Sequence, residues 1–257
     1  MGLTDRDFWD KYWDGIKLPS TVNMKNSFDR CLGDVLKREL SVVKGELFEV
    51  GCAPGKWLAY LAKECDLLPN GIEYSEEGMN ATRKNLRLLD VPAGKIIYGD
   101  FFKEKPVQQF DVVMSLGFIE HFENVHEVIE LHLQWLKPGG LLVIGIPNFS
   151  GITGYIQRVL DKTLLDKHNL TIMNLKYFND LAGKHSLDKR YTGYIGSFEP
   201  NMPIPKYKYG NPLQFLLKCF LRVFVMVRRY KLFDAINSPF TSSYILAVYR
   251  KKGDCFG

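Results

Sequence analysis

The sequence predicts an α/β domain in which helices cover both faces of a mainly parallel sheet. Two observations lead to this fold class. Through the middle of the chain, short apolar runs closed by polar or glycine-bearing stretches alternate with segments of helical periodicity, and this alternation is typical of parallel sheets. The 257 residues also have the composition of an ordinary globular protein, 46% hydrophobic and 25% charged, and are enough to bury one large core.

Apolar runs predict strands, and the segments between most of them predict helices. The strands are expected at 47–50, 67–73, 95–98, 110–115, 141–146, 190–198 and 243–250. The helices are expected at 28–40, 57–65, 76–89, 125–136, 155–165 and 174–185, after an N-terminal helix with Phe8, Trp9, Tyr12 and Trp13 at helical spacing. Because ligands of parallel sheets bind beyond the carboxyl ends of the strands, residues at those ends are the first site candidates.

A turn made of small residues follows the first strand. Residues 46–57 read ELFEVGCAPGKW, so the strand closes on Glu49, the next helix begins near Trp57, and 51–55 form the turn. Glycines there let a ligand approach the backbone and leave the first amides of the helix free. Alone this pattern is weak, because glycine-rich turns between a strand and a helix also bind dinucleotides or serve only packing.

The ends of the next strands carry further polar and aromatic residues in sheet order. Glu73 closes the second strand, where an acid can take both hydroxyls of a ribose. Asp100 closes the third, followed by two phenylalanines that can sandwich an adenine, and the fourth runs into SLGFIEHF. Helix capping would explain one such acid, but the ordered set favours contact with a ligand.

With these motifs in order, residues 47–146 resemble the class I S-adenosylmethionine (SAM)-dependent methyltransferases, most closely the small-molecule subgroup that includes ubiquinone-pathway, glycan and natural-product O-methyltransferases. The resemblance implies a Rossmann-like seven-stranded sheet with the last strand antiparallel, helices on both faces and an α-helical cap. It implies SAM as the methyl donor, S-adenosylhomocysteine (SAH) as the product, and a small-molecule acceptor methylated on oxygen.

The resemblance also assigns the donor site. The loop after the first strand would lie against the methionine part of the donor, Glu73 would bind its ribose, and Asp100 its adenine, with Phe101 beside the ring. The stretch 115–118 would form the floor of the pocket. The residues assigned to the donor are Glu49, Gly51, Ala53, Gly55, Trp57, Glu73, Tyr74, Asp100, Phe101, Ser115, Leu116, Phe118 and His121.

Two other functions stay open. Ala53 stands where the family usually has glycine, and Gly-x-Ala-Pro-Gly-x-Trp also occurs in RNA ribose methyltransferases. Those enzymes use a Lys-Asp-Lys-Glu tetrad, whereas PNFSGI follows the fifth strand here and the fourth ends without an acid, so a nucleic-acid acceptor is disfavoured. The other alternative is a non-catalytic protein that binds the S-adenosyl ligand without turnover.

Two histidines are candidates for catalysis. Methyl transfer is an in-line displacement that depends mainly on positioning, but a hydroxyl acceptor must also lose its proton, and histidine is the usual base near neutral pH. We favour His168, in the insertion that commonly caps the acceptor pocket in the resembled family, over His121 after the fourth strand. His126, His132 and His185 are interpreted as packing or surface residues.

The chain is expected to form a single domain over 1–257. Its parts would be an N-terminal helical lid (1–45), a donor-binding core (46–146), an acceptor cap (147–237) and a closing strand with a tail (238–257). The aromatic residues of the N-terminal helix would either shield the donor from water or simply pack that helix onto the sheet, and both interpretations stay open.

The composition favours one cellular location and suggests possible partners. Five scattered cysteines without ligand spacing, and an N-terminus unlike a signal peptide, favour a cytoplasmic protein with reduced thiols and no metal site. Residues 200–257 hold ten Lys and Arg against two acidic residues, and the helix expected at 212–231 has a wide apolar face and a basic stripe. Such a helix suits its own core or a homodimer interface, with peripheral contact to a membrane as an alternative.

Overall fold

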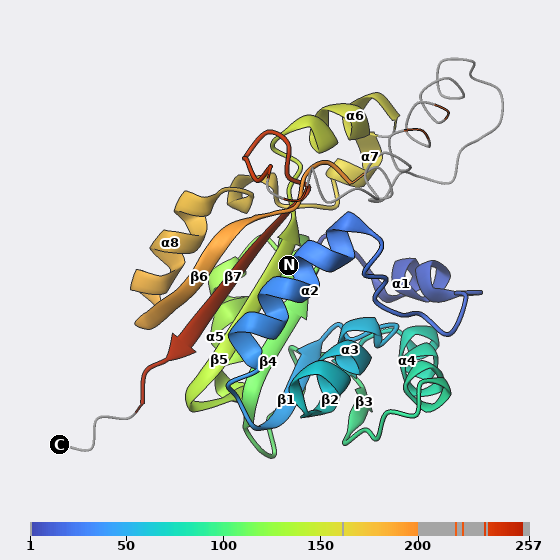
Figure 1. Cartoon of the computed structure of the whole chain (residues 1–257), viewed down its shortest axis with the longest axis vertical. Helices are drawn as coiled ribbons and strands as arrows, with labels where there is room; N and C mark the ends of the chain where they lie inside the picture. The colour runs from blue at the N-terminus through green and yellow to red at the C-terminus, as the bar shows by residue number, and fades with distance from the viewer. Residues whose placement is uncertain are drawn as a thin grey trace.

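The computed structural model describes residues 2–160, 162–199, 219, 223, 234 and 236–253. Its centre is a seven-stranded sheet in the order β3-β2-β1-β4-β5-β7-β6 (Figure 1). Strands β1 to β5 pair in parallel, and β7 runs antiparallel to both of its neighbours. The fold class that we predicted, a Rossmann-like sheet with the last strand antiparallel, is confirmed. The strands are β1 (Gly45–Val50), β2 (Leu67–Glu73), β3 (Ile96–Tyr98), β4 (Phe110–Leu116), β5 (Leu136–Pro147), β6 (Leu187–Ile195) and β7 (Tyr244–Lys251).

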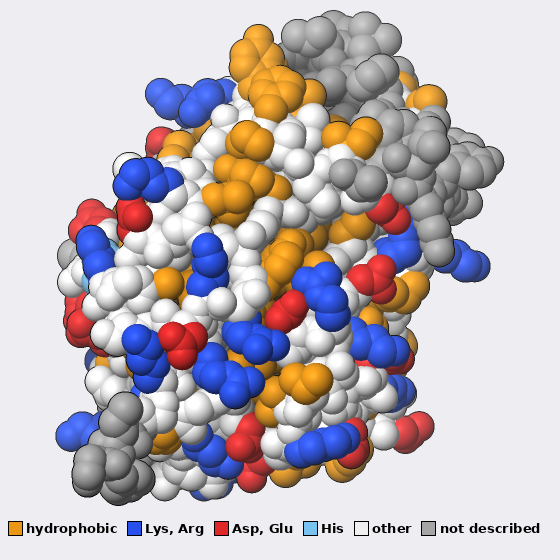
Figure 2. Space-filling view, turned by 60° about the vertical axis from the view of Figure 1, so that its left-hand side comes forward, with side chains coloured by type: hydrophobic (Ala, Val, Ile, Leu, Met, Phe, Trp, Pro, Cys, Tyr) orange, Lys and Arg blue, Asp and Glu red, His pale blue; other side chains and the backbone are white. Residues whose placement is uncertain are grey.

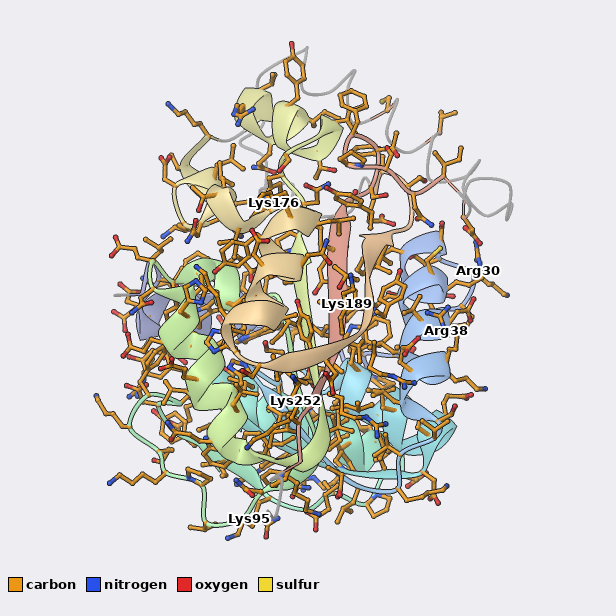
Figure 3. All side chains as sticks on the ribbon, turned by 90° about the vertical axis from the view of Figure 1, so that its left-hand side faces the viewer. Arg30, Arg38, Lys95, Lys176, Lys189 and Lys252 are labelled. Carbon is orange, nitrogen blue, oxygen red and sulfur yellow. The ribbon has the colours of Figure 1, made fainter. Side chains whose placement is uncertain are left out.

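Helices cover both faces of this sheet. In Figure 1, α2, α3 and α4 lie in front of the sheet and α5 lies behind it, while Figure 3 shows α8 alongside the edge strand β6. The described helices are α1 (Arg6–Trp13), α2 (Ser27–Leu40), α3 (Lys56–Cys65), α4 (Glu76–Leu88), α5 (Val125–Trp135), α6 (Ile152–Leu160), α7 (Lys162–Leu165) and α8 (Leu175–Lys184), with the short 3-10 helices η1 (Ile119–His121) and η2 (Leu170–Ile172).

Two apolar clusters hold the layers together. Leu36 of α2, Leu58 of α3 and Met79 of α4 pack on one face of the sheet. Val128 of α5 and Phe178 of α8 pack on the other. Because the central strands are buried between these clusters, they read as nearly continuous apolar runs in the sequence. Close packing on both faces fixes the ends of the strands, and so fixes the residues that follow them.

Several element boundaries differ from those that we predicted. Strand β6 covers Leu187–Ile195 and ends at Gly196, whose φ of +60° takes the chain out of the extended conformation, so the expected strand at 190–198 is shifted. The helix expected at 155–165 is found as α6 and α7, and α6 begins earlier. A Cβ at Gly154 would collide with the preceding chain, so glycine is what allows the first turn of α6 to form there.

The N-terminal segment crosses the carboxyl edge of the sheet. The backbone amide of Leu3 donates to the carbonyl of His121 (2.7 Å), beyond the end of β4. At the end of β2, the hydroxyl of Ser75 donates to the carboxylate of Asp10 in α1 (2.6 Å). Helix α1 is therefore tied to the protein on both sides of this edge, an arrangement that suits a lid and equally a helix that packs onto the strand ends.

Other predictions lie outside the described residues. Of the helix expected at 212–231, Cys219 and Val223 alone are described, so its contacts with a membrane, a second copy or its own core stay predictions. None of the described helices is long and apolar enough to cross a bilayer. Hydrophobic side chains gather toward the α6 end of the molecule in Figure 2, and Tyr155 and Val159 of α6 are exposed. The division into lid, core, cap and tail also stays a prediction.

Candidate active site

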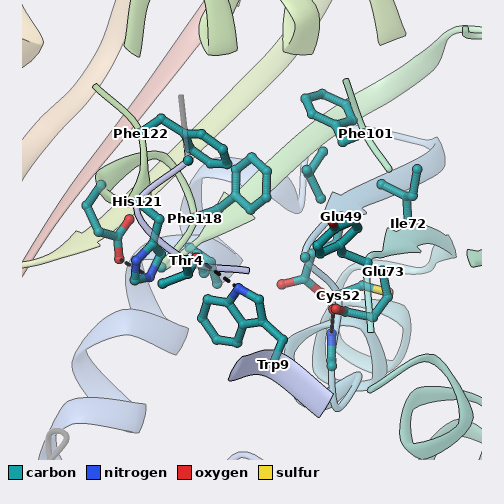
Figure 4. A pocket seen from close by; sticks show the side chains of 18 of the residues that line it. Thr4, Trp9, Glu49, Cys52, Ile72, Glu73, Phe101, Phe118, His121 and Phe122 are labelled. Carbon is teal, nitrogen blue, oxygen red and sulfur yellow. Dashed lines mark hydrogen bonds and ion pairs between the residues drawn. The ribbon is translucent and has the colours of Figure 1, made fainter. Parts of the chain in front are cut away.

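A cavity of about 680 Å³ lies at the carboxyl edge of the sheet. Its walls come from the ends of β1, β2 and β4, from α1, and from the segment after α7. Figure 4 shows His121 on one side of the cavity and Glu49 and Glu73 on the other, with Trp9 of α1 between them. The predicted site residues that line it are Glu49, Gly51, Ala53, Trp57, Glu73, Tyr74, Asp100, Phe101, Leu116, Phe118, His121 and His168.

The turn between β1 and α3 forms one wall. Gly51 has a φ of +69°, and a Cβ there would lie 3.2 Å from the ring of Phe118, so both conformation and space favour glycine. The amides of Gly51 and Cys52 donate to the carbonyl of Ile72 (2.9 and 3.3 Å), which ties the turn to β2. The turn is therefore held against β2, and it presents only small side chains to the cavity.

Two residues that we assigned to the donor do not line the cavity. Gly55 is the N-cap of α3 with a φ of +77°, and a Cβ there would lie 3.0 Å from the methyl group of Thr82. Its glycine therefore allows α3 and α4 to pack closely. Ser115 is fully buried within β4. Both residues support the cavity wall, and their contact with the donor stays a prediction.

Two carboxylates, Glu49 and Glu73, lie near the ends of β1 and β2, and each residue is 4% exposed. Glu73 accepts hydrogen bonds from the backbone amides of Ala53 (3.1 Å, to Oε2) and Ser75 (3.0 Å, to Oε1). Oε2 of Glu49 is buried and has no partner among the described residues. Burial raises the pKa of both carboxyls, and the charge of Glu73 raises the pKa of Glu49 further. A partnerless buried oxygen beside a bare turn fits a ligand that brings its own hydrogen-bond donors.

Aromatic residues after β3 and β4 form another part of the cavity wall. Phe101 is 4% exposed and packs edge-on against Phe118 (ring centroids 5.9 Å apart) and His132 (4.9 Å), so its ring belongs to the core and meets the cavity at its margin. Asp100 beside it accepts from the amide of Phe102 (3.1 Å), which holds the carboxylate at the rim. The pair that we predicted at this strand end is therefore present on the cavity wall.

The far end of the cavity brings together Glu120, His121 and His168. Nδ1 of His121 lies 2.8 Å from the carbonyl oxygen of Lys167, and Nδ1 of His168 lies 2.8 Å from that of Leu164. A carbonyl can only accept, so both rings donate from Nδ1 and keep a lone pair on Nε2. The two ring centroids are 4.6 Å apart. The sequence analysis named both histidines separately and gave no sign that they touch.

Glu120 is the functional candidate that the sequence analysis missed. It is 1% exposed, its Oε1 lies 3.9 Å from Nε2 of His121, and its Oε2 has no partner among the described residues. Burial raises the pKa of Glu120 to about 8. Burial lowers the pKa of His121 to about 3, with a smaller contribution from His168, whose own pKa burial also lowers. All three side chains are therefore neutral near pH 7, and the Glu120–His121 contact is not an ion pair. The signal for Glu120 was its place in the Glu-His pair after the fourth strand.

Tyr244 and two tryptophans also line the cavity. Tyr244 of β7 is 6% exposed. Burial raises the pKa of its hydroxyl well above the ordinary value, and the charges of Glu120 and Glu49 raise this pKa further. Trp9 of α1 donates from Nε1 to the hydroxyl of Thr4 (3.1 Å) and meets the ring of His121 edge-on. Trp13 also lines the cavity, so both tryptophans of α1 contribute large apolar side chains to its wall.

Comparison with protein families agrees with this geometry. The sequence profile of a family described as "methyltransferase domain" matches residues 25–186, which include the turn after β1 and both acidic strand ends. No curated protein sequence matches the chain.

Many solved structures share the fold. The SAM-dependent methyltransferase from Thiobacillus denitrificans, solved in complex with SAH, is 17% identical with a TM-score of 0.60, and the match covers 97% of this chain and 99% of that one. A SAM-dependent methyltransferase from Archaeoglobus fulgidus is 15% identical, with a TM-score of 0.54 and coverage of 86% and 94%. The plantazolicin methyltransferase BpumL with SAH is 17% identical, with a TM-score of 0.56 and coverage of 90% and 86%. At these identities the likeness shows a shared fold.

Proposed function

The chain belongs to the class I SAM-dependent methyltransferases, and from this premise we propose that it transfers the methyl group to an oxygen atom of a small-molecule acceptor. The observation that supports oxygen is the pair of neutral imidazoles, His121 and His168, each with an unprotonated Nε2 at the cavity wall. An alcohol or phenol must lose a proton to become a good nucleophile, whereas a neutral amine is a good nucleophile without losing one.

The part of the cavity formed by Glu49, Glu73 and the turn at Gly51, which we call the donor wall, fits the cofactor. The partnerless oxygen of Glu49 suits the ammonium group of the methionine part. Glu73 uses one lone pair of each carboxylate oxygen on a backbone amide and keeps others for the hydroxyls of the ribose. The bare surface at Gly51 allows close approach. When bound, SAM supplies an electrophilic methyl group on a sulfonium, and these residues bind and orient it.

The far end of the cavity, which holds His121 and His168 and which we call the acceptor end, supplies a base for the acceptor hydroxyl. Nε2 of His168 would take the proton of the acceptor hydroxyl as the oxygen bonds to the methyl carbon, and His121 is the alternative base. Burial keeps both rings unprotonated near pH 7, so the lone pair is present before the acceptor binds. Trp9 and Trp13 of α1 line the same cavity, and their apolar surface would shield the reacting atoms from water.

A small acceptor is favoured over RNA by the size of the cavity. The cavity volume of about 680 Å³ lies within the range of roughly 300–1,000 Å³ that is common for small-molecule sites.

The proposal is tested by following a labelled methyl group. The protein is incubated with SAM labelled at the methyl carbon and with pools of hydroxylated small molecules, and NMR locates the label, since a methyl carbon on oxygen resonates apart from one on nitrogen or carbon. We expect labelled methyl ethers or esters. Gly51→Arg, which fills the donor wall, serves as the matched inactive control. Label on nitrogen, on carbon or on RNA in a parallel incubation would contradict the proposal.

A further inference from the structure

We propose that Glu120, His121 and His168 bind a divalent transition-metal ion at the acceptor end of the cavity. The sequence analysis expected no metal site, because it searched for ligands at regular spacing. These three ligands come instead from η1 after β4 and from the loop after α7, which only the fold brings together.

The distances suit an ion. One ligand atom from each of the three side chains lies within 4.8 Å of the other two, and Oε1 of Glu120 lies 3.9 Å from Nε2 of His121. Bonds from nitrogen or oxygen to such an ion are about 2.0–2.2 Å long, which puts two ligands of one ion roughly 3–4 Å apart. The three atoms therefore need to move together by less than about 2 Å, a change that rotation of the side chains can supply.

The orientation of the imidazoles is that of metal ligands. Each ring donates its Nδ1 hydrogen to a backbone carbonyl, His121 to Lys167 and His168 to Leu164, both at 2.8 Å. Metal-bound histidines almost always make such a bond from the nitrogen that does not bind the ion, because it fixes the ring and its tautomer. Here it leaves both Nε2 lone pairs free to coordinate.

An independent observation is the carboxylate itself. Glu120 is 1% exposed, and its Oε2 has no hydrogen-bond partner in the described part of the chain. Buried polar atoms are nearly always paired, and a buried carboxyl group can ionise only where a cation or several donors stabilise its charge. A bound cation would supply that stabilisation.

The ligand set indicates which ions fit. Two imidazoles and one carboxylate suit Zn²⁺, Fe²⁺, Co²⁺ or Mn²⁺, whereas Mg²⁺ and Ca²⁺ prefer oxygen ligands alone. Three protein ligands leave coordination positions open, and all three residues line the cavity, so the open positions are accessible from it.

One consequence rests on the proposed function. An acceptor hydroxyl bound to the ion would release its proton to solvent near neutral pH, because the ion stabilises the oxygen anion. The oxygen would then bond to the methyl carbon of SAM, the methyl–sulfur bond would break, and SAH would leave as the thioether. With the ion bound, both Nε2 lone pairs are used in coordination, so the imidazoles would act as ligands and not as the base.

The test measures metal binding without donor or acceptor, so that its outcome does not depend on methyl transfer. The full chain is stripped with a chelator and titrated with Co²⁺, whose visible absorption changes when nitrogen and carboxylate ligands replace water. A parallel titration with Zn²⁺ is followed by calorimetry. We expect one ion per chain. His168→Ala and Glu120→Gln should each weaken binding by more than about 100-fold, beyond the 10–100-fold typical of residues that only orient the ligands.

The matched control is His185→Ala. His185 and His126 form a second histidine pair, with ring nitrogens 3.1 Å apart, outside the cavity. His185→Ala should leave the affinity unchanged, which separates the proposed site from capture of the ion by this other pair. Binding that is lost in His185→Ala, or is unchanged in His168→Ala, would overturn the proposal, as would a wild-type chain that binds neither ion.

Folding of each variant is checked by its affinity for SAH, which contacts the opposite wall. His168 lies in a loop, so His168→Ala carries the result if Glu120→Gln does not fold. A protein that binds the ion but transfers no methyl group to oxygen would contradict the proposed function and leave the metal site intact. A protein that methylates oxygen equally well after chelation, and binds no ion, would contradict only the metal site.

Discussion

Replacing Glu73 by glutamine should destabilise the fold and weaken SAH binding at the same time. Each carboxylate oxygen of Glu73 accepts one backbone amide, from Ala53 and from Ser75. Glutamine has a single oxygen, so one of these amides would face the NH₂ group of the new side chain. Leaving a buried amide without its acceptor should lower the free energy of unfolding by about 1–3 kcal/mol.

The same substitution removes the charged acceptor for the ribose hydroxyls. A hydrogen bond to a charged group contributes about 1.5–3 kcal/mol, so the Kd for SAH should rise roughly 10- to 150-fold. Titration calorimetry measures the Kd, and urea denaturation measures the free energy of unfolding. Glu77→Gln, at an exposed position in the first turn of α4, is the matched control and should change either quantity by less than about 0.5 kcal/mol.

Two results would refute this reasoning. An unchanged Kd for SAH in Glu73→Gln would show that the carboxylate does not bind the ribose. An unchanged free energy of unfolding would show that the hydrogen bonds from the two backbone amides to Glu73 do not stabilise the turn between β1 and α3.

Three further predictions concern the donor wall, the acceptor end and the core. Gly51→Arg should abolish the heat of SAH binding, because a side chain there meets Phe118 and fills the donor wall; measurable binding would contradict the site. His168→Ala should lower turnover by about 10²–10⁴ with SAH affinity intact, and a loss confined to His121→Ala would move the role to that residue. His132 is buried with a pKa lowered from 6.5 to about 4, so only the unfolded chain takes up its proton between these values. The stability that it contributes is complete above pH 6.5 and falls by about 1.4 kcal/mol per pH unit toward pH 4. In His132→Leu that part of the slope should vanish in urea denaturation measured across this range, and an unchanged slope would contradict the shift.

That the strand-end residues line one cavity could be predicted from the sequence, because their signals are local. Glu49, Gly51 and Glu73 each lie at a strand end, and strands that alternate with helices bring their carboxyl ends to one edge. Gly55 shows the limit of this reasoning. A glycine in a ligand-binding turn and a glycine between two packed helices look the same in a sequence, and only the structure shows that Gly55 packs against Thr82.

The acceptor end could not be predicted in the same way, because it depends on contacts between distant segments. His121 and His168 were each recognised as candidates, but their contact follows from hydrogen bonds to the backbone of α7 and the residues after it. The position of Glu120 before His121 was the one sequence signal for it, and its burial is known only from the fold. Tyr244 was expected only as part of the closing strand, whose position between β5 and β6 brings it to the cavity.

The most direct test of the account is a crystal structure of the protein with SAH. We predict that the ligand occupies the cavity, with its ammonium group beside Glu49, its ribose hydroxyls on Glu73, its adenine near Asp100, and its sulfur directed toward the end that holds His121 and His168. SAH bound elsewhere, or in the reverse direction with adenine beside the two histidines, would contradict the assignment of the donor and acceptor ends.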